Sequence, residues 1–437
     1  MSLQFITGNS GNGKTKYLFN RIVKEAKANP RDNYLVIVPE QFTMQTQRQL
    51  VDLSENKAIM NIDVLSFKRL AYRVFDELGI TNLTVLEETG KNLVLRKLAA
   101  QEADKLGVIG RNLNRIGYIS EVKSLLSELV QYNISPEELG RYIASGMLSD
   151  TLSDKLKDVL VLYEAFEKFM QDKYITAEEI LNVLSNVAEE SAILRNSVIA
   201  FDEFTGFTPI QNQLIKKLFV ISKKIYVTLT IDCREDIFKS RGMQELFDMP
   251  KRTVKTLTEM AAFYGIEVEE PIILDKNYRL AENEELSFME QQLFCKRRCS
   301  FKQAPKHIHI DCLRDPNHEL TMIARRINEL VRNENLRYRD IAIVTGDVNI
   351  YAGYVREIFD KYNIPYFIDA TQEILFHPFI EFIRSIPDIA AQNFSADAVF
   401  RFLRCGFSEL LDSEIDVLEN YVLACGVRGK SAWDKKW

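Results

Sequence analysis

Short apolar runs alternate with a helical pattern over about the first 85 residues of the chain. The runs at Leu3–Thr7, Tyr34–Val38 and Ile62–Leu65 predict strands, and residues 14 to about 28 have the spacing of a helix. Strands that are apolar on both faces and are joined through a helix are typical of a parallel sheet covered on both sides. The pattern therefore predicts an α/β fold.

From about residue 86 to residue 191 the pattern becomes helical. Apolar residues recur three and four positions apart, as in Val122, Leu125 and Leu129, and no strand is expected here. Strand patterns return at Ser197–Phe204 and Lys224–Thr230. These strands most simply rejoin the first sheet, which makes the helical stretch an insertion within one α/β domain.

A second α/β pattern follows, and it also favours a parallel arrangement. Helices are expected at about residues 317–333 and 350–362, and the chain after about residue 389 is expected to be helical. The expected strands are His307–Leu313, Asp340–Thr345 and Pro365–Ile368.

Composition narrows the class of protein. The 437 residues are 46% hydrophobic and 27% charged, as in ordinary soluble proteins of two to four domains. Because the 56 basic residues are outnumbered by 62 acidic ones, a histone-like basic binder is excluded. A local basic groove could still bind nucleic acid. The basic run formed by Lys296, Arg297, Arg298, Lys302 and Lys306 is either a phosphate contact or a solvated loop.

Cysteine usage and the lack of long apolar stretches predict a cytoplasmic protein without a membrane partner. The six cysteines are scattered, which indicates reduced thiols, and Cys295 and Cys299 alone have a spacing that would suit a metal. The N-terminus enters a strand at once, which leaves no room for a signal peptide. No apolar stretch approaches the roughly 20 residues that span a bilayer.

A phosphate-binding loop follows the first predicted strand. It satisfies the pattern G-x-x-x-x-G-K-[ST] at every position and opens a helix, which is the context that this motif requires. Its glycines let backbone N–H groups surround phosphates, Lys14 would reach the outer phosphates, and Thr15 would ligate Mg²⁺. The residues predicted to bind ATP are Gly8, Asn9, Ser10, Gly11, Asn12, Gly13, Lys14 and Thr15.

Two carboxylates follow the strand near residue 200. Asp202 would bind Mg²⁺, directly or through water, and Glu203 is the candidate catalytic base. A strand followed by Asp-Glu is also common as a solvated surface. The two carboxylates therefore indicate a catalytic site only in combination with the phosphate-binding loop.

The order of the motifs resembles superfamily 1 helicases. The resemblance rests on Val38–Thr43, Asp63–Ala71, Asp202–Phe204, Asn277–Arg279 and Asp340–Asp369. It implies a RecA-like parallel sheet followed by part of a second RecA-like domain. It also implies that Arg279 faces the γ-phosphate and acts with Lys14 in catalysis.

More narrowly, the stretches VPEQFT with the spaced Gln45, LSFKRLAYRVF and FDEFTGFTPIQ resemble the B subunits of bacterial AddAB-type ATP-dependent helicase/deoxyribonucleases. The resemblance implies a protein that scans single-stranded DNA for a recombination hotspot, pairs with an A subunit and takes part in double-strand-break repair. It implies a downstream nuclease domain with an iron–sulfur cluster, of which this sequence has no trace. The expected parts are the first half of domain 1A (1–85), a 1B-like helical insertion (86–192), the second half of 1A (193–275), the start of a 2A-like domain (276–389) and the start of a 2B-like helical insertion (390–437).

Two features depart from a working motor. Only seven residues precede the loop, which leaves no place for the adenine-reading glutamine motif, and the stretch Thr230–Asp236 lacks the glutamine of the motors' nucleotide sensor. An ATP-driven translocase is therefore the alternative function rather than the first choice. A P-loop kinase of an unrelated class is a third, although no acceptor site is evident.

Candidate DNA contacts follow the second and third predicted strands. Amide and hydroxyl groups could contact base edges, aromatic rings could stack on unpaired bases, and arginine could hold phosphate. Phe67 or Tyr72 could instead fill the core. The six candidates are Gln41, Thr43, Gln45, Phe67, Arg69 and Tyr72.

Overall fold

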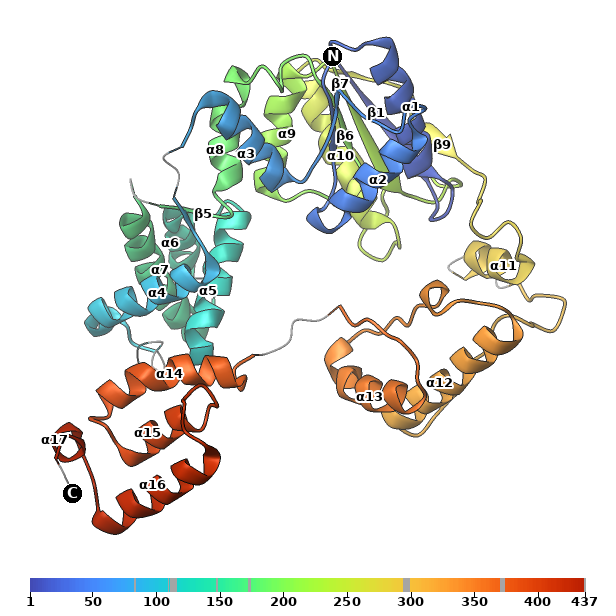
Figure 1. Ribbon diagram of the computed structural model, residues 1–437. Helices are drawn as coiled ribbons and strands as arrows, with labels where there is room; N and C mark the ends of the chain where they lie inside the picture. The colour runs from blue at the N-terminus through green and yellow to red at the C-terminus, as the bar shows by residue number, and fades with distance from the viewer. Residues whose placement is uncertain are drawn as a thin grey trace. The chain divides into compact units, whose positions relative to one another are not determined.

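The computed structural model describes residues 1–435 apart from 82–83, 109, 111–115, 147, 172–173, 294–298 and 370–373. It divides into two compact units, Met1–Ile308 and His309–Trp437, each of which is described by itself (Figure 1). Of the cysteine pair and the basic run, Cys295, Lys296, Arg297 and Arg298 lie outside the described residues.

A seven-stranded parallel sheet forms the centre of the first unit, as the apolar runs predict. Its order is β3-β2-β6-β7-β1-β8, and β9 also pairs with β1. Every pair is parallel. The strands are β1 (Ser2–Gly8), β2 (Tyr34–Ile37), β3 (Ile62–Leu65), β6 (Val198–Phe201), β7 (Lys224–Thr230), β8 (Glu267–Val268) and β9 (Ile272–Leu274).

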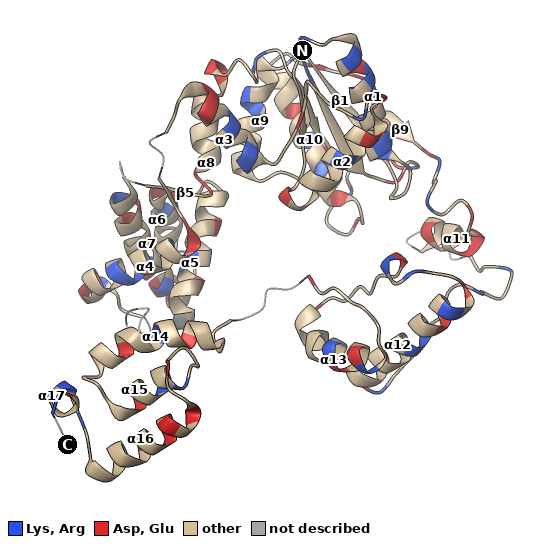
Figure 2. Cartoon of the chain, viewed as in Figure 1, with Lys and Arg blue, Asp and Glu red and all other residues tan. Residues whose placement is uncertain are grey.

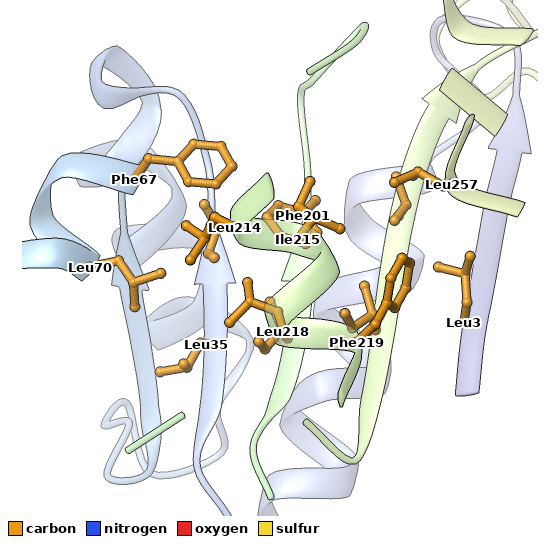
Figure 3. Close-up of a cluster of buried hydrophobic side chains, with 14 of the residues drawn as sticks. Leu3, Leu35, Phe67, Leu70, Phe201, Leu214, Ile215, Leu218, Phe219 and Leu257 are labelled. Carbon is orange, nitrogen blue, oxygen red and sulfur yellow. The ribbon is translucent and has the colours of Figure 1, made fainter. Parts of the chain in front are cut away.

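Helices cover both faces of this sheet because successive strand residues point to opposite sides. On β2, Leu35 belongs to the core cluster with α3, α8, α9 and α10, whereas Val36 belongs to the cluster with α1 and α2. Figure 3 shows the first of these clusters, in which Leu214 and Leu218 pack near Phe201. The helices are α1 (Lys14–Ala28), α2 (Thr43–Leu53), α3 (Phe67–Leu78), α8 (Ile180–Val187), α9 (Pro209–Ile221) and α10 (Asp248–Phe263), with the short η1 (Glu40–Phe42) before α2 and η4 (Ala188–Glu190) after α8.

The helical insertion has a core of its own, built from residues such as Leu98, Leu126 and Leu162. The pair of short parallel strands β4 and β5 was not expected in this stretch. The expected end of the insertion at residue 192 is too late, because Ile180 and Leu184 of α8 pack in the core of the sheet domain. The elements are β4 (Val85–Leu86), α4 (Glu88–Gln101), η2 (Ala103–Lys105), α5 (Ile116–Gln131), α6 (Pro136–Ala144), α7 (Asp150–Met170) and β5 (Ile175–Thr176).

The regular elements of the second unit are all helices in the part that the structure describes. The helices expected near residues 317–333 and 350–362 are confirmed, and they share a small core that includes Leu320 and Phe359. Figure 2 shows acidic and basic residues interspersed along both of them. Its elements are α12 (Pro316–Asn333), η5 (Tyr338–Asp340), α13 (Val348–Lys361), α14 (Pro378–Ala391), α15 (Ala396–Leu403), α16 (Asp412–Cys425) and α17 (Lys430–Trp433), whereas α11 (Glu284–Gln292) belongs to the first unit.

The three strands predicted at residues 307–313, 340–345 and 365–368 are wrong, since none of these described segments is a strand. A strand needs a neighbour for its backbone groups, and no ladder forms among the described residues of this unit. Several of the apolar side chains that suggested strands are exposed, and those of Ile310 and Val344 are 95% and 93% exposed, whereas Ile341 packs partly buried against the core of α12 and α13.

Candidate nucleotide-binding site

The phosphate-binding loop connects β1 to α1 at the carboxyl edge of the sheet. Gly11 and Gly13 have φ angles of 90° and 78°, in the left-handed region that favours glycine. Gly13 directly precedes α1 and has no side chain to cap it. The first N–H groups of α1 therefore stay available to an anion, and the helix dipole favours negative charge at this end.

Two asparagines hold the loop in place. Asn9 donates to Oε1 of Glu290 at 2.5 Å and accepts from the backbone N–H of Cys233 at 2.9 Å. Asn12 donates to the carbonyl oxygen of Leu274 at 2.5 Å. These variable positions of the motif therefore anchor the loop to β9, to α11 and to the chain after β7, which the sequence pattern does not reveal.

Lys14 lies folded back over the loop. Its Nζ donates to the carbonyl oxygens of Gly8 and Asn9, both at 3.0 Å. Burial lowers the pKa of Lys14, while the carboxylates of Glu203 and Asp202 raise it and Arg279 lowers it further. An ammonium group held by two carbonyls can exchange these partners for phosphate oxygens, which bind it more strongly because they carry charge.

Thr15 meets the two carboxylates that follow β6. Its hydroxyl lies 3.3 Å from Oδ1 of Asp202 and 3.3 Å from Oε1 of Glu203. Asp202 is buried and also accepts a hydrogen bond from the hydroxyl of Thr228 on β7. Glu203 is exposed and has a left-handed φ of 64°, a backbone conformation that costs energy in a residue other than glycine.

The buried carboxylate of Asp202 has the properties of a magnesium ligand that acts directly or through water. Burial raises its pKa, and the nearby charge of Glu203 adds to this effect, while hydrogen bonds from Thr228 and Thr15 lower it. Its Oδ2 atom is buried and has no hydrogen-bond partner among the described residues. A divalent cation would satisfy this oxygen and offset the cost of the buried charge.

Residues 277–279 lie directly on the loop. The side-chain amide of Asn277 donates to the carbonyl oxygen of Ser10 at 3.0 Å, and the backbone N–H of Tyr278 donates to that of Gly11 at 3.0 Å. Arg279 donates to the Ser10 hydroxyl at 3.3 Å. The structure therefore brings Arg279 to the loop within the first unit, although the sequence assigned these residues to the second domain.

The loop opens into a cleft of about 840 Å³. Charged and polar side chains from α1, α2, the ends of β6 and β7, and the 277–279 segment surround it. Among the described residues, no group of three or more His, Cys, Asp or Glu side chains could hold a metal by itself, so a cation here would share phosphate oxygens with Thr15 and Asp202. The lining includes Ser10, Gly11, Gly13, Lys14, Thr15, Lys16, Phe19, Phe42, Gln45, Thr46, Gln49, Asp52, Leu53, Asp202, Glu203, Phe204, Thr205, Thr228, Thr230, Tyr278 and Arg279.

The six candidate DNA contacts lie in different environments. Thr43 is buried and its hydroxyl donates to the carbonyl oxygen of Glu40 at 3.0 Å. Phe67 is buried too, with its ring centroid 5.8 Å from that of Phe201, so it fills the core. The four exposed candidates are Gln41, Gln45, Arg69 and Tyr72.

Three of the exposed candidates have identifiable neighbours. Arg69 lies 3.7 Å from a carboxylate oxygen of Glu40, and Gln45 lines the cleft beside the loop. Tyr72 is 39% exposed, and its ring packs edge-on against that of Phe75 with centroids 6.3 Å apart. Sequence reasoning did not single out Thr228 or Gln49, because a threonine inside a strand and a glutamine on a helix are ordinary there.

The described helices include none that is long and apolar enough to cross a bilayer. Residues 5–290 match the model of a protein family described as ADDB, N-terminal.

Curated relatives align with the chain from end to end. It is 38% identical to the B subunit of the ATP-dependent helicase/deoxyribonuclease of Lachnoclostridium phytofermentans. The identity is 34% with the protein of the same name from Clostridium acetobutylicum and 33% with that from Clostridioides difficile. Each alignment covers 100% of this chain and 38% of the relative, so the chain spans well under half the length of these relatives.

Proposed function

The chain belongs to the ADDB N-terminal family, and from this premise we propose that it is the helicase-like, ATP-binding part of the B subunit of a heterodimeric ATP-dependent helicase/exonuclease. The relatives that carry this name support the proposal. The partners would be an A subunit and single-stranded DNA, and the process would be repair of double-strand breaks by recombination. The task of the chain would be to scan DNA for a recombination hotspot.

One observation carries the nucleotide part of this proposal. Lys14, Thr15, Asp202 and Glu203 lie around one cleft at the end of β1 and β6. Lys14 would hold the outer phosphates, while Thr15 and Asp202 would hold Mg²⁺. Bound Mg²⁺ would neutralise developing phosphate charge, and Glu203 would accept a proton from an attacking water.

Calorimetric titration of Mg–ATP into this chain tests the nucleotide site. We expect binding by the wild type and its loss in Lys14→Ala. Lys24→Ala is the matched control, because Lys24 is an exposed lysine of the same helix that lies outside the cleft lining. Equal affinities for the wild type and Lys14→Ala would reject the site.

The DNA part of the proposal rests on the exposed side chains Gln41, Arg69 and Tyr72 near the ends of β2 and β3. Phosphate contacts make affinity fall as salt rises, by roughly 0.7 logarithmic units per contact and per tenfold salt for single strands. Anisotropy titrations of a labelled single strand at several salt concentrations measure this slope. An affinity that does not change with salt would reject the proposal.

An ATP-driven translocase is the second candidate, because the loop and the Asp202–Glu203 pair are complete. DNA-stimulated ATP hydrolysis by the complete protein without its partner, abolished by Lys14→Ala, would favour it. The scanning proposal predicts no translocation by that protein alone. We further propose that residues 276–389 and 390–437 begin the 2A-like and 2B-like parts of the complete protein.

A further inference from the structure

We propose that Gln45 and Gln49 of α2 bind the γ-phosphate end of the nucleotide and orient the attacking water. This inference rests on the proposed ATP site and extends it to a helix that the phosphate-binding motif does not include. Gln45, one of the six candidate DNA contacts, is thereby assigned to the nucleotide cleft.

The placement of one face of α2 is the first support. Gln45 and Gln49 both line the cleft that contains Lys14 and Glu203. Residues four positions apart lie on the same side of a helix. Gln47 lies between them in sequence but is absent from the lining, so the arrangement follows the helix face and not merely the local abundance of glutamine.

The direction of the cleft is the second support. The loop and the N-terminus of α1 receive phosphates, and Thr15, Asp202 and Glu203 mark the outer end of the phosphate chain, where hydrolysis would occur. α1 and α2 pack on the same face of the sheet. Gln45 and Gln49 line the same cleft as these three residues, so a nucleotide whose outer phosphates lie there would meet side chains of α2.

The chemistry of the amide group is the third support. A glutamine amide can both donate to and accept from an attacking water that lies between a carboxylate base and a phosphate. The stretch Thr230–Asp236 contains no glutamine. In this stretch Asp232 accepts hydrogen bonds from Arg234 instead, so α2 is the cleft element that presents glutamine amides.

The state of these side chains is the fourth support. Both are exposed, and no hydrogen bond joins either amide to another residue in the described part of the chain. Asn9 and Asn12, by contrast, are tied to neighbouring elements. Amides without such ties can turn toward a ligand without breaking the fold.

Comparing the affinities for a triphosphate and a diphosphate tests this proposal without relying on turnover. Titration calorimetry on this chain would use Mg–ATPγS and Mg–ADP with the wild type, the double variant Gln45→Ala/Gln49→Ala, Gln47→Ala and Lys14→Ala. We expect the double variant to lose at least about tenfold in affinity for ATPγS, roughly 1.4 kcal/mol, and less than about twofold for ADP. Gln47→Ala should match the wild type with both nucleotides.

The outcomes separate this proposal from the ATP site itself. Lys14→Ala should weaken both nucleotides, which reports on the site as a whole. Equal losses for ATPγS and ADP in the double variant, or no loss for either, would overturn the assignment of Gln45 and Gln49 while leaving the ATP site in place. Failure of the wild type to bind either nucleotide would overturn both.

Discussion

The hydroxyl of Thr15 lies 3.3 Å from Oδ1 of Asp202, although 187 residues separate them in sequence. The parallel pairing of β1 with β7 and of β7 with β6 brings the ends of these strands to one edge of the sheet. The long helical insertion leaves the sheet after β3 and returns before β6, so it does not disturb this edge. The proposed magnesium site is thus a consequence of topology.

Asp202→Asn should stabilise the protein and weaken its binding of Mg–ATP. The pKa of Asp202 is raised above its ordinary value of 3.8, chiefly by burial. Between the ordinary pKa and the raised pKa of the folded protein, the folded state binds more protons than the unfolded state. Stability therefore falls as the pH rises through this window. Above the raised pKa the substitution removes a buried charge, and there we expect the melting temperature to rise by roughly 2–4 °C, about 1 kcal/mol.

The pH dependence distinguishes this cause from a general effect of substitution. The gain of Asp202→Asn should disappear well below pH 3.8, where the wild-type carboxyl is protonated in both states. Glu203→Gln is the matched comparison, because Glu203 is adjacent but exposed, and its melting temperature should not change. A gain that is equal in both pH ranges would contradict burial of the charge as the cause.

Gly11→Ala should displace the segment that covers the loop. A Cβ atom at Gly11 would lie 2.7 Å from Oδ1 of Asn277 and 2.8 Å from Cβ of Arg279, which is too close for either contact. The φ of 90° adds strain of about 1 kcal/mol. We expect calorimetry to show at least a tenfold loss of ATP affinity, together with a lower melting temperature.

Gly79→Ala is the control that isolates backbone strain. Gly79 also has a left-handed φ, 69°, but a Cβ atom there would meet nothing within 4 Å. The melting temperature of Gly79→Ala should fall only by the amount that backbone strain causes, and its ATP affinity should equal that of the wild type. If both variants kept full affinity, the close approach of residues 277–279 to the loop would not matter for binding.

The local parts of the site were predictable from the sequence, whereas the contacts with segments far away in the sequence were not. The loop, the helix that starts at Lys14 and the carboxylates after β6 follow from a motif and from apolar runs. The anchoring of Asn9 by Glu290 and Cys233 depends on segments more than 200 residues away, and a single sequence carries no pattern for such pairs.

The limits of apolar patterns explain the remaining errors. The pattern at residues 340–345 matches that of a strand, but a strand also needs a neighbour to pair with, and the pattern does not supply one. Phe67 starts α3, and an aromatic ring at this position suits either stacking on a base or packing in the core. The structure shows that it packs in the core, against Phe201 and Phe204. α8 was assigned to the insertion because helical spacing does not say which core a helix joins.

Lys91→Ala should destabilise the helical insertion. Lys91 is buried on α4, and its Nζ lies 2.9 Å from Oε1 of Glu88, 2.7 Å from Oε2 of Glu178 and 3.3 Å from the hydroxyl of Ser127. Its loss leaves Glu178 without this partner, and we expect a cost of about 2 kcal/mol in urea-induced unfolding. Lys157→Ala, which breaks an exposed pair with Asp154, should cost less than about 0.5 kcal/mol.

Phe67→Ala and Tyr72→Ala should separate the core from the proposed DNA surface on the same helix. Phe67 packs against Phe201 and Phe204 with ring centroids 5.8 and 5.6 Å apart, so its truncation should cost about 3–4 kcal/mol of stability. Tyr72 is 39% exposed and packs edge-on against Phe75, so Tyr72→Ala should cost less stability than Phe67→Ala and weaken single-strand binding roughly tenfold through lost stacking. Denaturant unfolding and anisotropy titrations measure the two effects.

An exposed tyrosine elsewhere on the chain is the control for this pair of variants. Tyr132→Ala, which removes an exposed tyrosine of the helical insertion, should change neither stability nor DNA affinity. If Tyr72→Ala kept full affinity for DNA, the face of α3 would not be the binding surface, because the ring would have nothing to stack on there. Gln41 and the end of β2 would then be the remaining candidates for the DNA-binding surface.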